Sequence, residues 1–269
     1  MFPAADMVIQ QADYFILIML RVSGLVINSP IFGRVNVPNM ARIGLALSLG
    51  FMFFIRFPQV ENIYYTTLFG FVLLCAAELL IGMALAYVTN IFFSLTAFTA
   101  GQLIDMQIGF GIVNVFDAQN QTQVPMIGNV LNIMMLILFF LVNGHLRLIE
   151  ILHITIDAIP IGSPVISGAI GLAVLEVFIR AFLLGVMMAL PILASGLTLE
   201  VGFGMMMRAV PQIHMFVVGI PLKMLVGLIV FSITLPVFAG FTDRIFAEMF
   251  NSIELVFGTF YAGQPEPVP

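Results

Sequence analysis

The sequence contains very little charge. Asp, Glu, Lys and Arg make up 9% of its 269 residues, whereas 61% are hydrophobic, and the mean hydropathy is +1.15. Soluble domains carry charge on about a quarter of their residues, so this chain cannot cover itself with a solvated surface. We therefore expect an all-α integral membrane protein without a large soluble domain.

Cysteine, tryptophan and basic clusters are scarce or missing. The single cysteine, Cys75, excludes an internal disulfide, and a net charge of −5 argues against nucleic acid as a partner. No tryptophan accompanies the 27 phenylalanines, although lipid-facing helices usually carry Trp and Tyr at both interfaces. This weak aromatic belt indicates that much of the surface meets protein rather than lipid.

Catalytic signatures are missing as well. The sequence contains no HExxH, no G-x-S-x-G and no phosphate-binding G-x-x-x-x-G-K pattern. Gly109-Phe-Gly111 begins like a dinucleotide motif, but Asn114 stands where the third glycine belongs. The three histidines lack cysteine or carboxylate ligands at metal-site spacing. The chain is expected not to be an enzyme and to hold no cofactor or metal.

Two apolar runs are longer than a bilayer requires. Residues 64–100 contain Glu78 as their only charge and no proline. As one helix this run is about 55 Å long, against about 30 Å for the hydrocarbon core. The missing proline favours one long helix over two spans. Residues 165–199 form a second run of this kind.

Glycines and prolines predict interruptions in the second half. Residues 200–208 contain two glycines and are expected to form a turn. Three methionines follow there, and they are candidates for a deformable seal, although such runs more often simply pack: Met205, Met206 and Met207. Residues 213–240 are expected to be kinked or interrupted at Pro221 and Pro236.

A few charges interrupt the apolar segments. Arg21 either pairs with a partner or extends to the interface. Four others are candidate functional charges: Glu78, Glu176, Arg180 and Lys223. Structural alternatives stand beside these roles. Glu176 and Arg180 are four apart, an order that predicts a self-neutralising pair on one helix, and Glu78 also suits a hydrogen bond to a neighbouring helix.

The middle of the chain, residues 101–126, is a polar stretch between apolar runs, with three glycines and no lysine or arginine. Lipid cannot satisfy its backbone groups, so it is either solvated or buried by protein. Its apolar members favour a loop that lines or blocks a cavity, with a water-exposed linker as the alternative. The candidate pore-loop residues are Ile108, Gly109, Phe110, Gly111, Ile112, Val113, Val115, Phe116 and Asp117.

The last helix is predicted over residues 243–261 and is amphipathic. Its polar side is acidic, whereas membrane-surface helices usually carry Lys and Arg there, so we expect it to dock on protein. Its apolar side comprises Ile245, Phe246, Met249, Phe250, Ile253, Val256, Phe257 and Phe260, and its polar side Glu248, Asn251, Ser252 and Glu254. Residues 262–269 are expected to be a disordered tail.

Short motifs occur in a fixed order along the chain. They are Pro30-x-x-Gly33, Val37-Pro38, Arg42, Gly101-Gln102, Phe116-Asp117, Asn143-Gly144-His145, Leu190-Pro191 and Pro211-Gln212-Ile213-x-x-Phe216-x-x-Gly219-x-Pro221-Leu222. From about residue 14 to residue 257 this ordered set resembles the FliR family of flagellar biosynthesis proteins and its relatives in virulence type III secretion. Ala118 and His214 depart from the family pattern, where proline and asparagine are common.

The resemblance implies a fold and a function. The fold is a set of long, tilted helical hairpins packed with P-type and Q-type subunits into a spiral hetero-oligomer. This assembly is the type III secretion export gate of the bacterial inner membrane, at the flagellar basal body, and it passes unfolded protein cargo. Membrane lipid and other export-apparatus proteins are further partners. The loop at about residues 106–125 helps to close the pore.

These expectations divide the single membrane domain, residues 1–269, into N-terminal helices (1–100), central pore loop (101–126), C-terminal helices (127–242), amphipathic helix (243–261) and tail (262–269). Two rival functions remain open. One is an ion-coupled secondary transporter that uses the four candidate charges, and the other is a structural nucleus for assembly that never contacts cargo.

Overall fold

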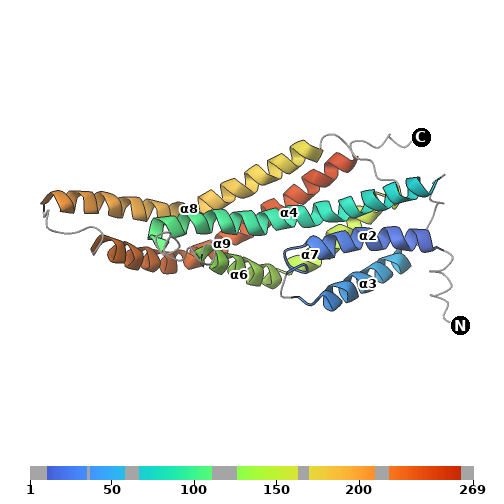
Figure 1. Cartoon of the computed structure of the whole chain (residues 1–269), viewed down its shortest axis with the longest axis horizontal. Coiled ribbons are helices and arrows are strands. Elements are labelled where there is room, and N and C mark those ends of the chain that lie inside the picture. Colours follow the sequence, from blue (N-terminus) through green and yellow to red (C-terminus); the bar gives the residue numbers. More distant parts are fainter. Residues whose placement is uncertain are drawn as a thin grey trace. The chain divides into compact units, whose positions relative to one another are not determined.

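The computed structural model describes residues 11–34, 37–57, 67–110, 126–162, 170–209 and 218–261. Every regular element in these ranges is a helix (Figure 1). In chain order they are α2 (Ala12–Asn28), α3 (Asn39–Arg56), α4 (Leu68–Ile108), α6 (Met126–Leu141), α7 (Gly144–Ala158), α8 (Ile170–Ala209) and α9 (Ile220–Tyr261). The protein is therefore all-α, as its composition predicts. The tail at 262–269 lies outside the described residues.

The helices belong to two compact units. Unit 1 contains α2, α3, α4 up to Ile91, α7, α8 up to Val177 and α9 from Met249. Unit 2 contains α4 from Phe92, α6, α8 from Phe178 and α9 up to Glu248. The three longest helices thus contribute residues to both units.

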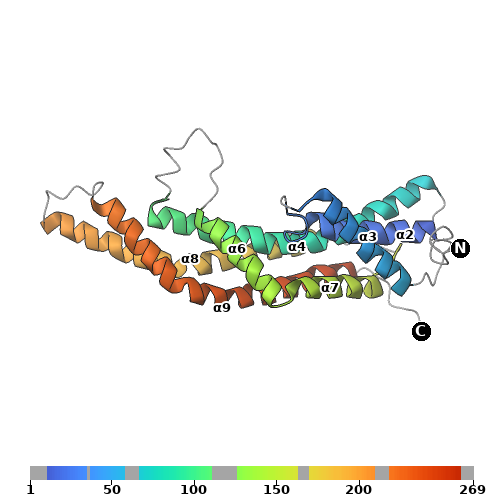
Figure 2. The ribbon, with the colours of Figure 1, turned by 90° about the horizontal axis from the view of Figure 1, so that it is seen from below.

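Unit 1 is organised around α2, about half of whose residues are buried. Helix α3 lies beside α2 (Figure 2), and the rings of Phe15 and Phe54 meet edge to face at 5.3 Å. Helix α4 approaches α2 closely, because a Cβ atom on Gly82 would collide with the main-chain carbonyl of Arg21. Unit 1 therefore brings the α2 backbone at position 21 against α4 near Glu78.

Unit 2 has an aromatic core. Phe93 of α4, Phe139 of α6 and Phe246 of α9 pack mutually, with ring centroids 5.2 to 5.9 Å apart. The hydroxyl of Thr96 donates a hydrogen bond of 3.2 Å to the carbonyl of Ala181 on α8. This side chain binds α4 to α8 where Ala181 is fully buried, so the core of unit 2 joins four helices.

Three helices are far longer than a bilayer crossing. Helix α4 has 41 residues, α8 has 40 and α9 has 42, which corresponds to about 60 Å each. The prediction that residues 64–100 contain one uninterrupted helix is confirmed, since α4 runs without a break from Leu68 to Ile108.

The predicted turn at residues 200–208 is wrong, because α8 continues through them to Ala209. A Cβ on Gly202 or Gly204 would meet nothing within 4 Å, so neither glycine is required by a close contact. A glycine in a helix costs about 1 kcal/mol relative to alanine. Breaking the helix in apolar surroundings would leave backbone groups unsatisfied, which costs more.

The sequence predicts that residues 213–240 are kinked or interrupted, and the interruption is wrong for the described residues 220–240, as is the separate last helix. Residues 213–217 lie outside the described residues. Helix α9 is continuous from Ile220 to Tyr261, with Pro236 inside it. Pro221 stands in the first turn, where a missing N–H is tolerated. Near Pro236, the hydroxyls of Ser232 and Thr234 donate to carbonyls one turn earlier, at 2.9 and 2.8 Å. These two bonds go to the carbonyls of Leu228 and Val230, whereas the carbonyl that loses its helical donor at Pro236 is that of Ser232.

The end of α9 is amphipathic and docks on protein, as predicted. Ile245 and Ile253 on its apolar side are fully buried. In unit 1 the guanidinium of Arg147 on α7 lies 4.3 Å from the ring centroid of Phe250, a favourable cation–π contact. Ser252 differs from the prediction, because it is 1% exposed rather than part of the solvated side.

Four helices of the described chain are long and apolar enough to cross a membrane, namely α3, α4, α8 and α9. Helices α6 and α7, separated at Val142 and Asn143, make a fifth if they are counted as one broken span. In an apolar 18-residue segment of α4 22% of residues are buried, and in a corresponding segment of α9 11% are buried. Most of this apolar surface must therefore meet lipid or another chain.

Candidate functional site

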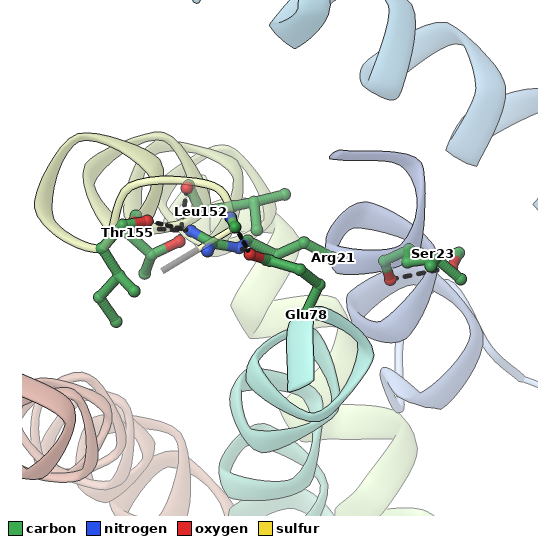
Figure 3. Close-up of polar contacts among 8 residues, drawn as sticks. Arg21, Ser23, Glu78, Leu152 and Thr155 are labelled. Atoms are coloured by element: carbon green, nitrogen blue, oxygen red, sulfur yellow. Dashed lines mark hydrogen bonds and ion pairs between the residues drawn. The ribbon is translucent and has the colours of Figure 1, made fainter. Parts of the chain in front are cut away.

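A buried ion pair lies inside unit 1, between Arg21 of α2 and Glu78 of α4 (Figure 3). Arg21 Nε donates to Glu78 Oε2 at 2.6 Å, and both side chains are 0% exposed. Arg21 Nη1 also donates to the carbonyls of Thr155 and Ile159, each at 2.9 Å. Glu78 Oε1 accepts the N–H of Gly162 at 2.8 Å. One ion pair thus connects α2, α4, the end of α7 and the turn after it.

This arrangement neutralises both charges and satisfies backbone groups at the end of α7. The carbonyl of Thr155 already accepts the N–H of Ile159 at 2.9 Å, but carbonyls at the end of a helix carry partial negative charge, so a guanidinium suits them. Arg21 therefore pairs in the interior rather than extending to the interface. The structural interpretation of Glu78 is favoured over an exchangeable functional carboxylate, since a protein cation and an N–H occupy its two oxygens.

The charges on α8 and α9 form different contacts. Arg180 Nη1 lies 3.4 Å from Glu248 Oε2 of α9, with the two side chains 37% and 34% exposed. Glu176 stands one turn before Arg180 on α8, and its pairing with Arg180 stays a prediction. Glu248 was assigned from sequence to the polar face of a helix and was not recognised as a partner, because nothing in sequence spacing links residues 68 apart.

Lys223 belongs to a third cluster, in unit 2. Its Nζ lies 2.5 Å from Oε1 of Glu200 on α8, with the side chains 19% and 39% exposed. Gln107, in the last turn of α4, directs its Nε2 to the same oxygen at 3.5 Å. The candidate charges therefore do not form one cluster among the described contacts. Glu78 pairs with Arg21, Arg180 with Glu248 and Lys223 with Glu200. Neither Glu200 nor Gln107 was a sequence candidate.

The central stretch begins later than predicted. Residues 101–108 form the end of α4 rather than a loop. The helix ends at Ile108, and the next residue, Gly109, has a φ of 101°. Only glycine adopts this conformation without strain. Ile108 is 1% exposed and packs against Gly227 of α9. Of the other candidate pore-loop residues, Phe110 is half-buried; outside the described residues lie Gly111, Ile112, Val113, Val115, Phe116 and Asp117.

The two ends of the central stretch approach each other in unit 2. Asp105, 3% exposed, accepts the N–H of Ile127 in the first turn of α6 at 3.3 Å. An aspartate at this place satisfies one of the free N–H groups of a helix start. Gly101 and Gly128 pack backbone against backbone, so Gly101 has no room for a Cβ. The described ends of the stretch are therefore held together by α4 and α6.

The three methionines lie on α8, where Met205 and Met206 are 65% and 54% exposed and Met207 is half-buried. Within this chain they do not form a packed layer, so a seal formed by them remains a hypothesis that needs a partner. Among the described residues no group of three His, Cys, Asp or Glu side chains is placed to hold a metal. Cys75 is a free, half-buried thiol.

Known proteins resemble this chain over most of its length. Residues 12–249 match the family described as bacterial export proteins, family 1. The chain is 32% identical to the flagellar biosynthetic protein FliR of Escherichia coli (strain K12) over 233 residues, 87% of this chain and 88% of that protein. It is 28% identical to FliR of Bacillus subtilis (strain 168) over 236 residues, 87% and 90% of the two chains. The chain therefore belongs to the bacterial export proteins of family 1, the family in which FliR proteins are found.

Proposed function

We propose that this chain is a core subunit of the flagellar type III export gate. In this proposal it joins P-type and Q-type subunits in the bacterial inner membrane, at the flagellar basal body. Together they form the channel through which unfolded flagellar proteins pass. The protein acts as a structural component of the export apparatus and not as an enzyme.

The length of the exposed apolar surface carries this proposal. On α4, exposed apolar side chains occur from Leu68, 80% exposed, to Met106, 64% exposed, a distance of about 57 Å along the helix. On α8 they occur from Leu172 to Met206, about 51 Å. Lipid covers about 30 Å, and contiguous apolar surface beyond this is stable only against protein. Other apparatus subunits are the natural covering for these helices.

We further propose that the central stretch helps to close the channel. Its described start supports this role, since Ile108 is buried and Asp105 binds the first turn of α6. Because the described ends of the stretch are attached to α4 and α6, the proposal assigns the closure of the channel to the apolar residues between them. A free solvated linker has no need of such attachments.

The pairing of the charges favours an export gate over an ion-coupled transporter. Glu78 is fully buried and occupied by Arg21 and Gly162, whereas a coupling carboxylate must release and bind ions in each cycle. Lys223 is engaged by Glu200. These contacts suit a protein that holds its helices in fixed register.

Expression of the chain alone and with P-type and Q-type subunits tests the assembly. Alone in detergent, the chain is expected to aggregate or to be degraded, because its apolar surface lacks partners. With both partners it is expected to elute as one monodisperse complex. A stable, monodisperse chain on its own that transports ions would contradict the proposal.

Deletion of residues 110–116 tests the closure. The deletion leaves the helices that bury apolar area untouched, so the complex is expected to assemble in normal amount. Cells that carry it are expected to take up a membrane-impermeant dye. An assembled complex with a tight membrane would show that the central stretch is a linker.

A further inference from the structure

The residue before the start of the central stretch contacts an ion pair that is formed by two other helices. Glu200 of α8 and Lys223 of α9 lie 2.5 Å apart, and Gln107 of α4 reaches the same carboxylate oxygen. Gln107 immediately precedes Ile108, the first candidate pore-loop residue. The pair therefore connects three helices at the point where α4 ends.

Small residues make this junction close-fitting. A Cβ on Gly196 of α8 would collide with the side chain of Gln107, and one on Gly227 would lie 2.8 Å from Cγ1 of Ile108. The space that remains between these side chains is a cavity of about 10 Å³, at the lower limit for one water molecule. Ile108 thus packs in a site that the α8–α9 pair holds in shape.

We infer that Glu200 and Lys223 are positioning residues, which hold the end of α4 and the start of the central stretch against α8 and α9. This inference rests on the proposed closure of the channel. Lys223 lies in the first turn of α9, one turn before Gly227, so its attraction to Glu200 fixes α9 where Ile108 packs. Loss of that attraction frees Ile108 from its site without disturbing the aromatic core of unit 2.

Charge reversal with rescue tests this role in cells that also express the partner subunits. K223E places two carboxylates side by side. It is expected to raise the fraction of molecules with Ile108 undocked roughly tenfold, which corresponds to about 1.4 kcal/mol. This energy is larger than the usual contribution of a partly exposed ion pair to stability. The repulsion between the two carboxylates in K223E supplies the remaining energy. K223E is therefore expected to raise dye uptake toward that of the 110–116 deletion, with the assembled complex unchanged on a native gel. The swapped variant E200K/K223E is expected to restore a tight membrane.

Two controls separate the possible failures. R244E reverses an exposed charge on the same helix and is expected to leave the membrane tight. If the deletion leaks while K223E stays tight, the positioning role is wrong and the proposed closure stands. If the deletion itself stays tight, the proposed closure has failed.

A neutral variant covers the case in which K223E does not assemble. E200Q/K223M removes the attraction without leaving an unpaired charge, so the complex is expected to form. Dye uptake by that assembled complex supports the positioning role. Because E200Q/K223M loses only the attraction, about 1 kcal/mol or less, its dye uptake is expected to rise by up to about fivefold. Uptake by E200Q/K223M equal to that of the unaltered complex, or a leak of K223E that the swapped variant fails to reverse, overturns the positioning role.

Discussion

Neutralising Glu78 alone should destabilise the protein strongly. In E78Q, Arg21 remains charged and fully buried, with two carbonyls as its remaining described acceptors. Breaking a buried ion pair by removing one partner typically costs 3–5 kcal/mol, because the other charge stays buried without compensation. Most single domains have 5–15 kcal/mol of total stability. E78Q is therefore expected to lower sharply the amount of assembled complex.

The double variant R21Q/E78Q should be milder than either single change. It carries no buried charge, and its two amides can bond to each other and to the N–H of Gly162. The shorter Gln side chain at position 21 ends near the place of Arg21 Nε, so it does not reach the carbonyls of Thr155 and Ile159, which Nη1 contacts. Some cost remains, since each buried backbone group left unsatisfied costs about 1–3 kcal/mol. E254Q is the matched control, because Glu254 is exposed on α9 and surface substitutions usually stay within about 0.5 kcal/mol.

The measurement is thermal stability of the co-purified complex by size-exclusion chromatography after heating, together with export of a flagellar protein into the medium. The order expected for stability is unaltered chain and E254Q, then R21Q/E78Q, then E78Q. A stable E78Q complex that no longer exports would refute the structural interpretation and identify Glu78 as a functional carboxylate.

Three further substitutions are expected to act through packing, pairing and capping. G82A should prevent close approach of α4 to the α2 backbone and lower complex yield, whereas G202A, with open space around it, should raise helix stability by up to about 1 kcal/mol; heat-stability measurements on both variants check this. E176Q/R180M should be no more damaging than R180M alone if the two side chains neutralise each other. Because Arg180 is 37% exposed, its loss should cost about 1 kcal/mol or less, and a larger loss of complex on heating would contradict this. D105N keeps an acceptor for the first turn of α6 and should be tolerated, whereas D105L should cost about 1 kcal/mol; equal stability of D105N and D105L complexes would show that the cap is unimportant.

The amino-acid sequence alone determined the class of the protein and the existence of its long helices. Scarce charge and long apolar runs leave the chain no soluble alternative, and an apolar environment enforces helices because they satisfy their own backbone. For the same reason, the glycines and prolines that usually mark turns were misleading in this sequence. Gly202, Gly204 and Pro236 read as turns or breaks, yet α8 and α9 pass through them, since the environment penalises an open backbone more than these residues penalise a helix.

The tertiary structure decided which charges meet. Arg21 and Glu78 are 57 positions apart, and Gln107 and Glu200 are 93 apart. Helical periodicity relates residues three or four apart on one helix, so it suggested Glu176 with Arg180 but carried no information on Arg21 with Glu78. Partners on different helices are set by which faces pack and by the glycines that let backbones approach. The described partners of Arg21, Arg180 and Lys223 therefore followed from packing, whereas the membrane class followed from composition and the family from the order of motifs along the chain.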